Sequence, residues 1–401
     1  ILVFSNQTIA DLYFEKFKSI LIEKDKIFYF TIKDGEEYKN IESILSVYDF
    51  MLENNFSRKS LVISLGGGVI CDMGGYISAT YMRGIEFIQV PTSLLAQVDA
   101  SVGGKVAINH PKCKNMIGSF KSPYRVLIDV EFLKTLAERE FKSGMGELLK
   151  HSLLTKDKKY LEYIENNVEK IKALDNEVLE NIVEQSIRIK KHYVDIDPFE
   201  KGERAFLNLG HTYAHTLESF FAYKAYTHGE AVAKGIIFDL ELSLLRGKID
   251  EAYLERARNI FNLFNIDTDL IYLDSDKFIP LMRKDKKNSF NKIITILLDN
   301  QGNLSKTEVK EDEIVKIIAK YKNNFLRASI DIGTNSCRLF IAEVKEIDNE
   351  IRLLRLEKEI DRLSLTQQVS ASAESLSPKN LLANTWVSLL FNNKRWINIA
   401  L

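Results

Sequence analysis

The sequence has few cysteines, no excess of charge of either sign and no long apolar run, and each absence excludes a class of protein. Its three cysteines, Cys71, Cys113 and Cys337, are far apart and odd in number. That pattern argues against a disulfide framework or a cysteine-based metal site and suits a reducing cytoplasm. The 55 basic and 56 acidic side chains give a net charge of -1, so we expect neither nucleic acid nor a membrane as partner. No run is apolar for long enough to span a bilayer.

What is present is ordinary for a globular protein of more than one domain. The chain has 401 residues, of which 45% are hydrophobic and 28% charged, and this length suits two or three domains. It begins directly with the apolar run at residues 1–4, without an initiator Met or a signal peptide. We therefore expect the natural start of the first domain to be missing.

The first third of the chain alternates short apolar runs with amphipathic stretches such as residues 40–53. That alternation is typical of a Rossmann-like α/β domain, in which helices cover the faces of a parallel sheet. The runs predicted as strands are residues 1–4, 26–32, 60–65, 84–90 and 125–129.

The periodicity is mainly helical from residue 137 to about 245, and again at 251–264. A strand and turn at 293–302 and a closing helix at 311–321 follow. We place an α/β domain at 1–138 and a mainly α-helical domain at 139–324. Residues 325–401 form an appendage in which 326–344 predict strand, tight turn, strand, and it is too short to complete a further domain.

A glycine-rich turn follows the predicted strand at 60–65. Gly66, Gly67 and Gly68 let the backbone approach a ligand closely, and the helix after them would point free amides at a phosphate. The turn lies at the carboxyl end of a parallel strand, where open α/β sheets bind ligands. This favours a nucleotide site, although glycine triplets also occur as plain turns.

Polar residues are dense in the segments around this turn. Lys105 follows the pair Gly103-Gly104, and Lys114 and Asn115 follow shortly after. Lys and Asn side chains suit a small substrate with hydroxyl, carboxylate or phosphate groups. The alternative is a set of ordinary solvated loops.

Three of the six histidines fall in one short stretch. His211 and His215 share one face of a predicted helix, and His228 follows it. Two histidines and one carboxylate are a common catalytic metal set. Glu147 is the favoured carboxylate and Glu230 the competing one. The alternative is a hydrogen-bonded histidine pair without a metal.

Taken together, these segments resemble the 3-dehydroquinate synthase family, from residue 1 to about 322. The residues that carry the resemblance are 66–72, 80–84, 88–92, 97–99, 101–105, 114–118, 204–212, 228–232 and 285–287.

The resemblance implies specific roles for residues of this chain. A divalent metal, zinc or cobalt, would be held by Glu147, His211 and His228. Arg83 would reach the substrate phosphate in the neighbouring subunit, which implies a homodimer. The catalytic centre around the sugar-acid phosphate would contain Asp99, Lys150, Lys190, Arg204, Asn208 and His215, with Lys105, Asn115 and one of Lys286 and Lys287. NAD would be lined by Asp34, Gly35, Glu36, Glu37, Tyr38, Lys39, Gly68, Val69, Ile70, Cys71, Asp72, Thr92, Ser93, Lys105, Lys114, Phe132, Leu133, Lys134 and Thr135.

The family converts 3-deoxy-arabino-heptulosonate 7-phosphate into 3-dehydroquinate and phosphate, in the shikimate route to chorismate and the aromatic amino acids. The resemblance implies transient oxidation of the substrate by NAD, elimination of phosphate, reduction and an internal aldol closure. The metal would act as a Lewis acid on adjacent hydroxyls.

The sequence departs from the family pattern at a few positions. Cys71 and Cys113 stand where glycine is usual, and Cys71 would be strained by roughly 1–2 kcal/mol if its backbone needed a positive φ. Asn6 and Thr8 replace residues that help to hold NAD, which puts that contact in doubt.

The appendage has a separate resemblance. Residues 330–336 are similar to the first phosphate loop of the exopolyphosphatase and guanosine pentaphosphate phosphatase family. Most of that fold is absent, so we expect no hydrolase activity from it.

Three alternatives stay open: a related sugar-phosphate cyclase, a metal-dependent polyol dehydrogenase of the same fold, and an inactive fusion module. The pair Lys114-Asn115, together with Arg204 and the pair Lys286-Lys287, favours a phosphorylated, carboxylate-bearing substrate over a plain polyol.

Overall fold

The computed structural model describes residues 1–20, 26–271, 273–283, 292–321, 329–332 and 337–340. The chain forms two compact units: Ile1–Asp269 with Ser275–Ile314, and Leu270–Asp274 with Val315–Leu401. The domain boundaries expected at residues 138 and 324 stay predictions.

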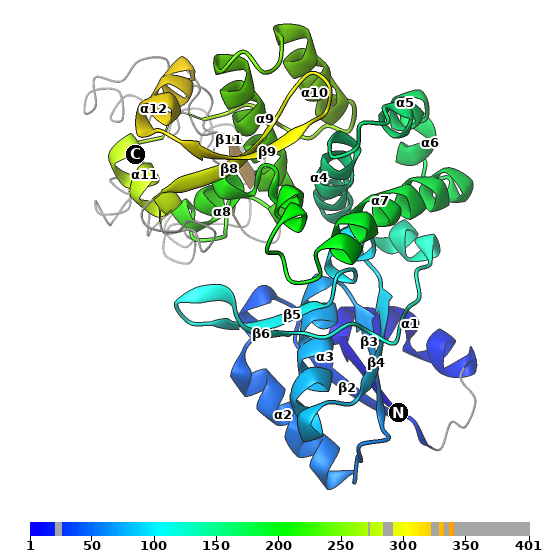
Figure 1. The fold of residues 1–401 in the computed structure, drawn as a ribbon. Coiled ribbons are helices and arrows are strands. Elements are labelled where there is room, and N and C mark those ends of the chain that lie inside the picture. The colour runs from blue at the N-terminus through cyan, green and yellow to red at the C-terminus, as the bar shows by residue number, and fades with distance from the viewer. Residues whose placement is uncertain (21–25, 272, 284–291, 322–328, 333–336, 341–401) are drawn as a thin grey trace, which may run out of the picture. The chain divides into compact units, whose positions relative to one another are not determined.

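The amino-terminal part of the first unit is a five-stranded parallel sheet of order β2-β1-β3-β4-β7 (Figure 1). Every predicted strand is present, with ends that differ from the prediction by at most three residues. The strands are β1 (Leu2–Asn6), β2 (Phe28–Ile32), β3 (Leu61–Gly66), β4 (Glu86–Pro91) and β7 (Arg125–Val126).

Side-chain alternation along the strands builds a separate core on each face of this sheet. Leu2 and Phe4 of β1 pack in one core with α2 (Ile41–Glu53) and α3 (Gly68–Thr80). Val3 faces the other core, where α1 (Gln7–Ile20) packs. Helix α2 begins where the periodicity predicts, because the Asn40 side chain caps it by accepting from the Ser43 amide.

The polar segments around Lys105 and Asn115, for which no strand was predicted, form an antiparallel hairpin of β5 (Lys105–His110) and β6 (Cys113–Phe120). Val106 and Ile108 alternate inward and are buried, which is the pattern of a half-buried strand. Val106 packs so tightly over α3 that a β-carbon on Gly75 would lie 2.2 Å from it. The hairpin thereby holds polar side chains over the carboxyl ends of the sheet.

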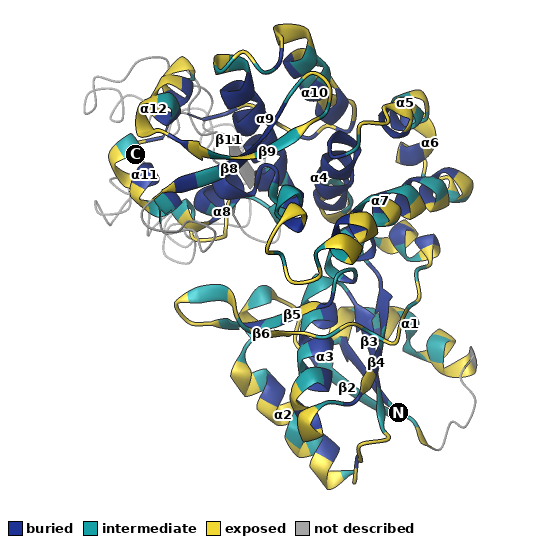
Figure 2. Ribbon diagram, in the orientation of Figure 1, coloured by how far each residue is buried: buried dark blue, intermediate teal, exposed yellow. Residues whose placement is uncertain are grey.

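The predicted helical region is confirmed. Helix α9 is apolar almost all round and buried along most of its length (Figure 2), so it forms the centre of the helical core. The helices are α4 (Glu138–Leu153), α5 (Lys159–Asn166), α6 (Val168–Lys172), α7 (Asn176–Ile196), α8 (His211–Phe220), α9 (His228–Leu245), α10 (Glu251–Leu263) and α11 (Ser275–Arg283).

Short helical turns connect these elements: η2 (Glu36–Tyr38), η3 (Tyr81–Arg83), the π-helix η4 (Ala96–Ala100), η5 (Val130–Thr135) and η6 (Glu203–Asn208). Strand β8 (Ile293–Leu298) is the late strand that the sequence predicts. It pairs antiparallel with β9 (Leu304–Val309), which the sequence does not predict.

The closing helix is α12 (Glu311–Lys320). In the appendage, β10 (Ser329–Ile332) and β11 (Cys337–Phe340) pair antiparallel, as the predicted strand, turn and strand require. Residues 333–336 of the phosphatase-like motif lie outside the described residues. In the part of the chain that the structure describes, no helix is both long and apolar enough to cross a membrane.

Candidate active site

A cavity of about 1770 Å³ opens at the carboxyl ends of the parallel strands and extends to helices α7, α8 and α9. Its position matches the ligand crevice of open α/β sheets. The structure brings most of the predicted site residues to this cavity. Those that line it are Asp34, Gly35, Glu36, Lys39, Gly68, Val69, Ile70, Asp72, Thr92, Ser93, Asp99, Lys105, Lys114, Asn115, Phe132, Thr135, Lys150, Lys190, Arg204, Asn208, His211, His215 and His228.

The remaining predicted residues lie elsewhere. Arg83 is exposed in η3 and does not line the cavity. Lys286 and Lys287 lie outside the described residues. The cavity lining also leaves out Glu37, Tyr38, Cys71, Leu133, Lys134 and the fully buried Glu147.

The glycine turn forms one wall of the cavity, where Gly67 precedes the first turn of α3. A β-carbon on Gly66 would lie 2.8 Å from Ile70, so this position requires glycine. Cys71 is buried inside the first turn of α3 and donates its amide to Gly67 O at 3.0 Å. It is not among the residues with positive φ, so the strain considered for it does not arise. The start of α3 faces the cavity with the positive end of its dipole.

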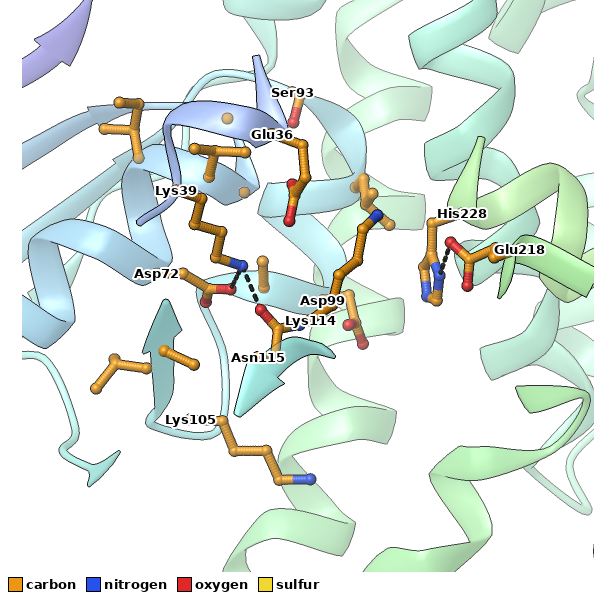
Figure 3. A pocket seen from close by; sticks show the side chains of 18 of the residues that line it. Glu36, Lys39, Asp72, Ser93, Asp99, Lys105, Lys114, Asn115, Glu218 and His228 are labelled. Atoms are coloured by element: carbon orange, nitrogen blue, oxygen red, sulfur yellow. Dashed lines mark hydrogen bonds and ion pairs between the residues drawn. The ribbon is translucent and has the colours of Figure 1, made fainter. Parts of the chain in front are cut away.

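Three polar side chains join this wall to the hairpin (Figure 3). Lys39 Nζ lies 2.6 Å from Asp72 Oδ2 and 2.6 Å from Asn115 Oδ1. Burial alone lowers the pKa of Lys39, but Asp72 and Glu36 together outweigh burial and leave the pKa raised. Lys39 therefore stays charged and fixes Asn115 at the cavity. Asn6 and the Thr8 amide both bond to Asp34, so these two variant positions hold a lining residue in place.

On the opposite wall, three residues from three helices converge. His211 Nε2 and His228 Nε2 lie 3.4 Å and 3.2 Å from the same Glu147 oxygen, Oε1. Lys150 makes an ion pair with the other oxygen of Glu147. Neither oxygen accepts a hydrogen bond of good geometry, although both are buried. Two imidazole nitrogens and a buried carboxylate in mutual reach form a donor set suited to a divalent metal.

Backbone contacts set the positions of these three residues. A β-carbon on Gly229 would lie 1.8 Å from Ser143 O, so α9 crosses α4 at van der Waals contact of their backbones. The small residues Ser143 and Gly146, which precede Glu147, therefore permit close packing of the two helices. At the start of α8, Gly210 has a φ of 81° and donates its amide to Asp239 at 2.7 Å.

Glu230, the competing carboxylate, is engaged elsewhere. It forms a capping box with Thr227 at the start of α9 and a two-pronged ion pair with Arg139 at 2.9 and 3.1 Å. It therefore stabilises the turn that carries His228 and does not face the other histidines.

Several residues that the resemblance assigns to the substrate are bonded to other groups of the protein. Lys190 Nζ lies 2.7 Å from Asp99 Oδ1. Burial alone raises the pKa of Asp99, but Lys190, Lys150 and His151 together outweigh burial and hold the pKa well below its usual range. Asn208 donates to Glu200 at 2.6 Å, and Lys105 pairs with the same carboxylate. Arg204 donates to Gly103 O at 2.8 Å.

Two residues at the cavity escaped the sequence reasoning. Glu200 lies in an irregular segment with no periodic signal. Glu218 lies seven residues after His211, on the same face of α8. Its Oε1 is 3.5 Å from His228 Nδ1. Burial alone raises the pKa of Glu218, but His228, with smaller contributions from His215 and Lys114, outweighs burial and lowers the pKa to about 2.

This combination of sheet, glycine turn and helical core is a fold that solved synthases and dehydrogenases share. It matches the 2-epi-5-epi-valiolone synthase of Streptomyces hygroscopicus, solved with NAD+ and Zn2+ bound, with a TM-score of 0.73 and 24% identity. The match covers 80% of this chain and 90% of that one.

Matches to protein-family models define the family more narrowly than the fold does. The models for the amino- and carboxyl-terminal parts of 3-dehydroquinate synthase match residues 29–143 and 144–288. The chain belongs to the 3-dehydroquinate synthase family, which confirms the resemblance seen in the sequence.

Two relatives show the extent of the likeness. The bifunctional 3-dehydroquinate synthase/phosphatase of Fusobacterium nucleatum is 87% identical over 372 residues, which is 92% of this chain and 56% of that protein. The 3-dehydroquinate synthase of Shewanella strain MR-4 is 41% identical over 288 residues, or 72% of this chain and 80% of that one. The chain thus spans little more than half the length of the first relative.

Proposed function

We propose that this chain acts as a 3-dehydroquinate synthase, converting 3-deoxy-arabino-heptulosonate 7-phosphate into 3-dehydroquinate and phosphate in the shikimate pathway. The observation that carries the proposal is the Glu147, His211 and His228 cluster across one cavity from the glycine turn. A plain nucleotide-binding domain has no need of such a buried donor set.

The residues fit the cofactors of this reaction. Glu147, His211 and His228 would hold zinc or cobalt, because the Nε2 atoms of both histidines lie within 3.4 Å of the same buried carboxylate oxygen, Glu147 Oε1. NAD would lie along Gly68–Asp72, with Asp34, Thr92 and Phe132 beside it. When bound, these groups supply reversible hydride transfer and Lewis-acid polarisation of the substrate hydroxyls.

The protein's own residues bind and orient the substrate. Lys150, Lys190, Arg204, Asn208 and His215 surround the same end of the cavity, where several donors in a region shielded from water hold a phosphate strongly. Asp99 and Glu200 now pair with part of this set. A substrate phosphate would replace Glu200 as the partner of Lys105 and Asn208.

The proposal includes a cytoplasmic homodimer. Arg83 is exposed and has a φ of 69°, next to Met82 with a φ of 48°. Two successive residues other than glycine with positive φ are an uncommon backbone conformation, and such conformations are typical of functional contacts. Arg83 would bind the substrate phosphate in the partner subunit's cavity.

One assay separates the proposal from its alternatives. The purified protein is supplied with the heptulosonate phosphate, NAD and zinc, and phosphate, dehydroquinate and NADH are followed together. Phosphate and dehydroquinate without net NADH support the synthase. Accumulation of NADH indicates a polyol dehydrogenase. Turnover of another sugar phosphate indicates a related cyclase. Folded protein without any of these activities indicates an inactive module.

The expectation that residues 325–401 contribute no hydrolysis stays a prediction. Hydrolysis of polyphosphate by the purified chain would contradict it.

A further inference from the structure

Glu218 lies beside the histidine cluster without belonging to the ligand set described above. It is on α8, three residues after His215 and seven after His211, so all three side chains lie on one face of the helix. Glu218 is 7% exposed, and Figure 3 shows its carboxylate directed at the His228 ring. A buried carboxylate in this position needs a partner, and His228 supplies it.

The two histidines of the cluster are held in the same way. In each ring Nε2 points to Glu147 Oε1, at 3.4 Å for His211 and 3.2 Å for His228. In each ring Nδ1 points to an acceptor on the other side. His211 Nδ1 lies 3.1 Å from Leu209 O, and His228 Nδ1 lies 3.5 Å from Glu218 Oε1. The acceptor on Nδ1 sets which nitrogen carries the proton and which is left to bind a metal.

The two acceptors differ in kind. Leu209 O is a neutral backbone carbonyl two residues from His211, so it is fixed by the chain itself. Glu218 is an anionic side chain on a different helix from His228. A carboxylate on Nδ1 makes an imidazole a stronger donor than a carbonyl does, because it stabilises the positive charge that the ring acquires on binding a cation.

We propose that Glu218 is a positioning residue, which accepts the Nδ1 proton of His228 and thereby orients Nε2 and strengthens it as a ligand for a divalent metal. This inference rests on the proposed function, since it needs Glu147, His211 and His228 to be the metal site. One face of helix α8 then carries a proposed metal ligand, His211, a proposed substrate residue, His215, and the positioning residue Glu218.

The competing assignment makes Glu218 a ligand itself. His215, Glu218 and His228 also have ligand atoms in mutual reach, and a metal there would use Nδ1 of His228. That arrangement makes no use of the buried oxygen Glu147 Oε1, although the Nε2 atoms of His211 and His228 both approach it. The site with Glu147 brings all three of these atoms to one cation, which is why the geometry favours it.

The test measures zinc binding, separately from turnover, by titrating metal-free full-length protein against a chromophoric chelator. We expect Glu218→Ala to weaken zinc affinity by about 10- to 100-fold. Glu218→Gln should lose less, because its amide oxygen still accepts from Nδ1. The cobalt-loaded proteins provide a second measurement, since loss of the Nδ1 acceptor should shift the visible absorption of bound Co2+ in Glu218→Ala and less in Glu218→Gln.

Glu241→Ala is the matched control. Glu241 is also a buried carboxylate, on α9, 2.9 Å from Arg258. Its loss should lower thermal stability and leave zinc affinity and the cobalt spectrum unchanged. The control therefore distinguishes loss of the Nδ1 acceptor from a general loss of stability.

The outcomes are distinct. Wild-type affinity and spectrum in Glu218→Ala overturn the role of Glu218 and leave the proposed function intact. Loss of zinc in Glu218→Ala with retention in Glu147→Gln makes Glu218 a ligand and overturns the positioning role. Failure of the wild-type protein to bind zinc overturns the proposed metal site and this inference with it.

Discussion

A β-carbon on Gly146 would lie 2.4 Å from the carbonyl oxygen of Gly229, so α4 and α9 meet at a point where neither glycine has room for a side chain. Glu147 is next to the first glycine and His228 next to the second. The crossing of the two helices therefore sets the spacing of two proposed metal ligands.

Gly229→Ala tests this relationship. Its new methyl group would lie 1.8 Å from Ser143 O, so the helices must separate. We expect a loss of about 1–3 kcal/mol in the free energy of unfolding, with weaker zinc binding because His228 moves away from Glu147. Urea unfolding and zinc titration measure the two effects. Gly202→Ala is the control, since its nearest neighbour, Asp197 Oδ2, is at an ordinary 3.7 Å. Wild-type zinc affinity in Gly229→Ala would show that the crossing does not set the spacing.

His211→Ala removes one proposed ligand and leaves a small gap at the start of α8. We expect loss of zinc binding and of dehydroquinate formation, with the circular dichroism spectrum retained. The exposed His192 provides a control, because His192→Ala changes a histidine outside the cavity. Turnover retained by His211→Ala would contradict the ligand assignment.

Arg83→Ala tests the proposed homodimer. We expect little activity from Arg83→Ala alone, since each site would lack its phosphate contact from the partner. Mixing it with the inactive His211→Ala variant should restore about a quarter of wild-type activity, because half of randomly assorted dimers are mixed and each has one complete site. The mixture is assayed after exchange of subunits. A mixture as inactive as its components, despite verified exchange, argues against a contribution from the partner.

Cys71→Gly tests whether cysteine is strained in the turn. Since Cys71 is helical and fully buried, replacement by the glycine usual in the family should not relieve strain. We expect it to lower stability by about 1 kcal/mol, because glycine is a poor helix former. Thermal unfolding is the measurement, and a higher melting temperature for the variant would restore the strain hypothesis.

The ion pair of Arg246 and Glu313, 2.7 Å apart, predicts a dependence of stability on pH. The Arg246 hydrogen bond lowers the pKa of Glu313 in the folded protein, against a smaller effect of burial. The pair therefore stabilises the fold above the unfolded pKa of Glu313, about 4.5, and the contribution disappears as the pH falls below it. Relative to wild type, Glu313→Gln should be less stable by about 1 kcal/mol at pH 7 and nearly equal at pH 3. A constant difference across this range would exclude the mechanism.

Local pattern was sufficient to predict the parallel sheet and most helices. Continuous apolar runs such as β3 mark strands covered on both faces, and the 3.6-residue period of α7 marks a helix with one buried side. The sequence does not predict the β5–β6 hairpin, because polar residues that line the cavity interrupt its apolar alternation. Strand β9 was missed because its exposed side chains carry little hydrophobic signal.

The sequence by itself determined the residue types of the site and their places on elements: two histidines four apart on one helix, a third after a turn, and a carboxylate directly after a glycine. Its family resemblance also implied which of them would form the metal set, but only the tertiary structure decided what each of them contacts. It joins His211 to His228 and Glu147, engages Glu230 in a cap, and brings Glu218 to the far side of His228. The physical reason is that the spacing of residues along a helix determines which side chains share a face. Which other residues that face contacts depends on where the helices cross. That crossing depends on backbone contacts, here between Gly146 and Gly229, made by residues far apart in the chain.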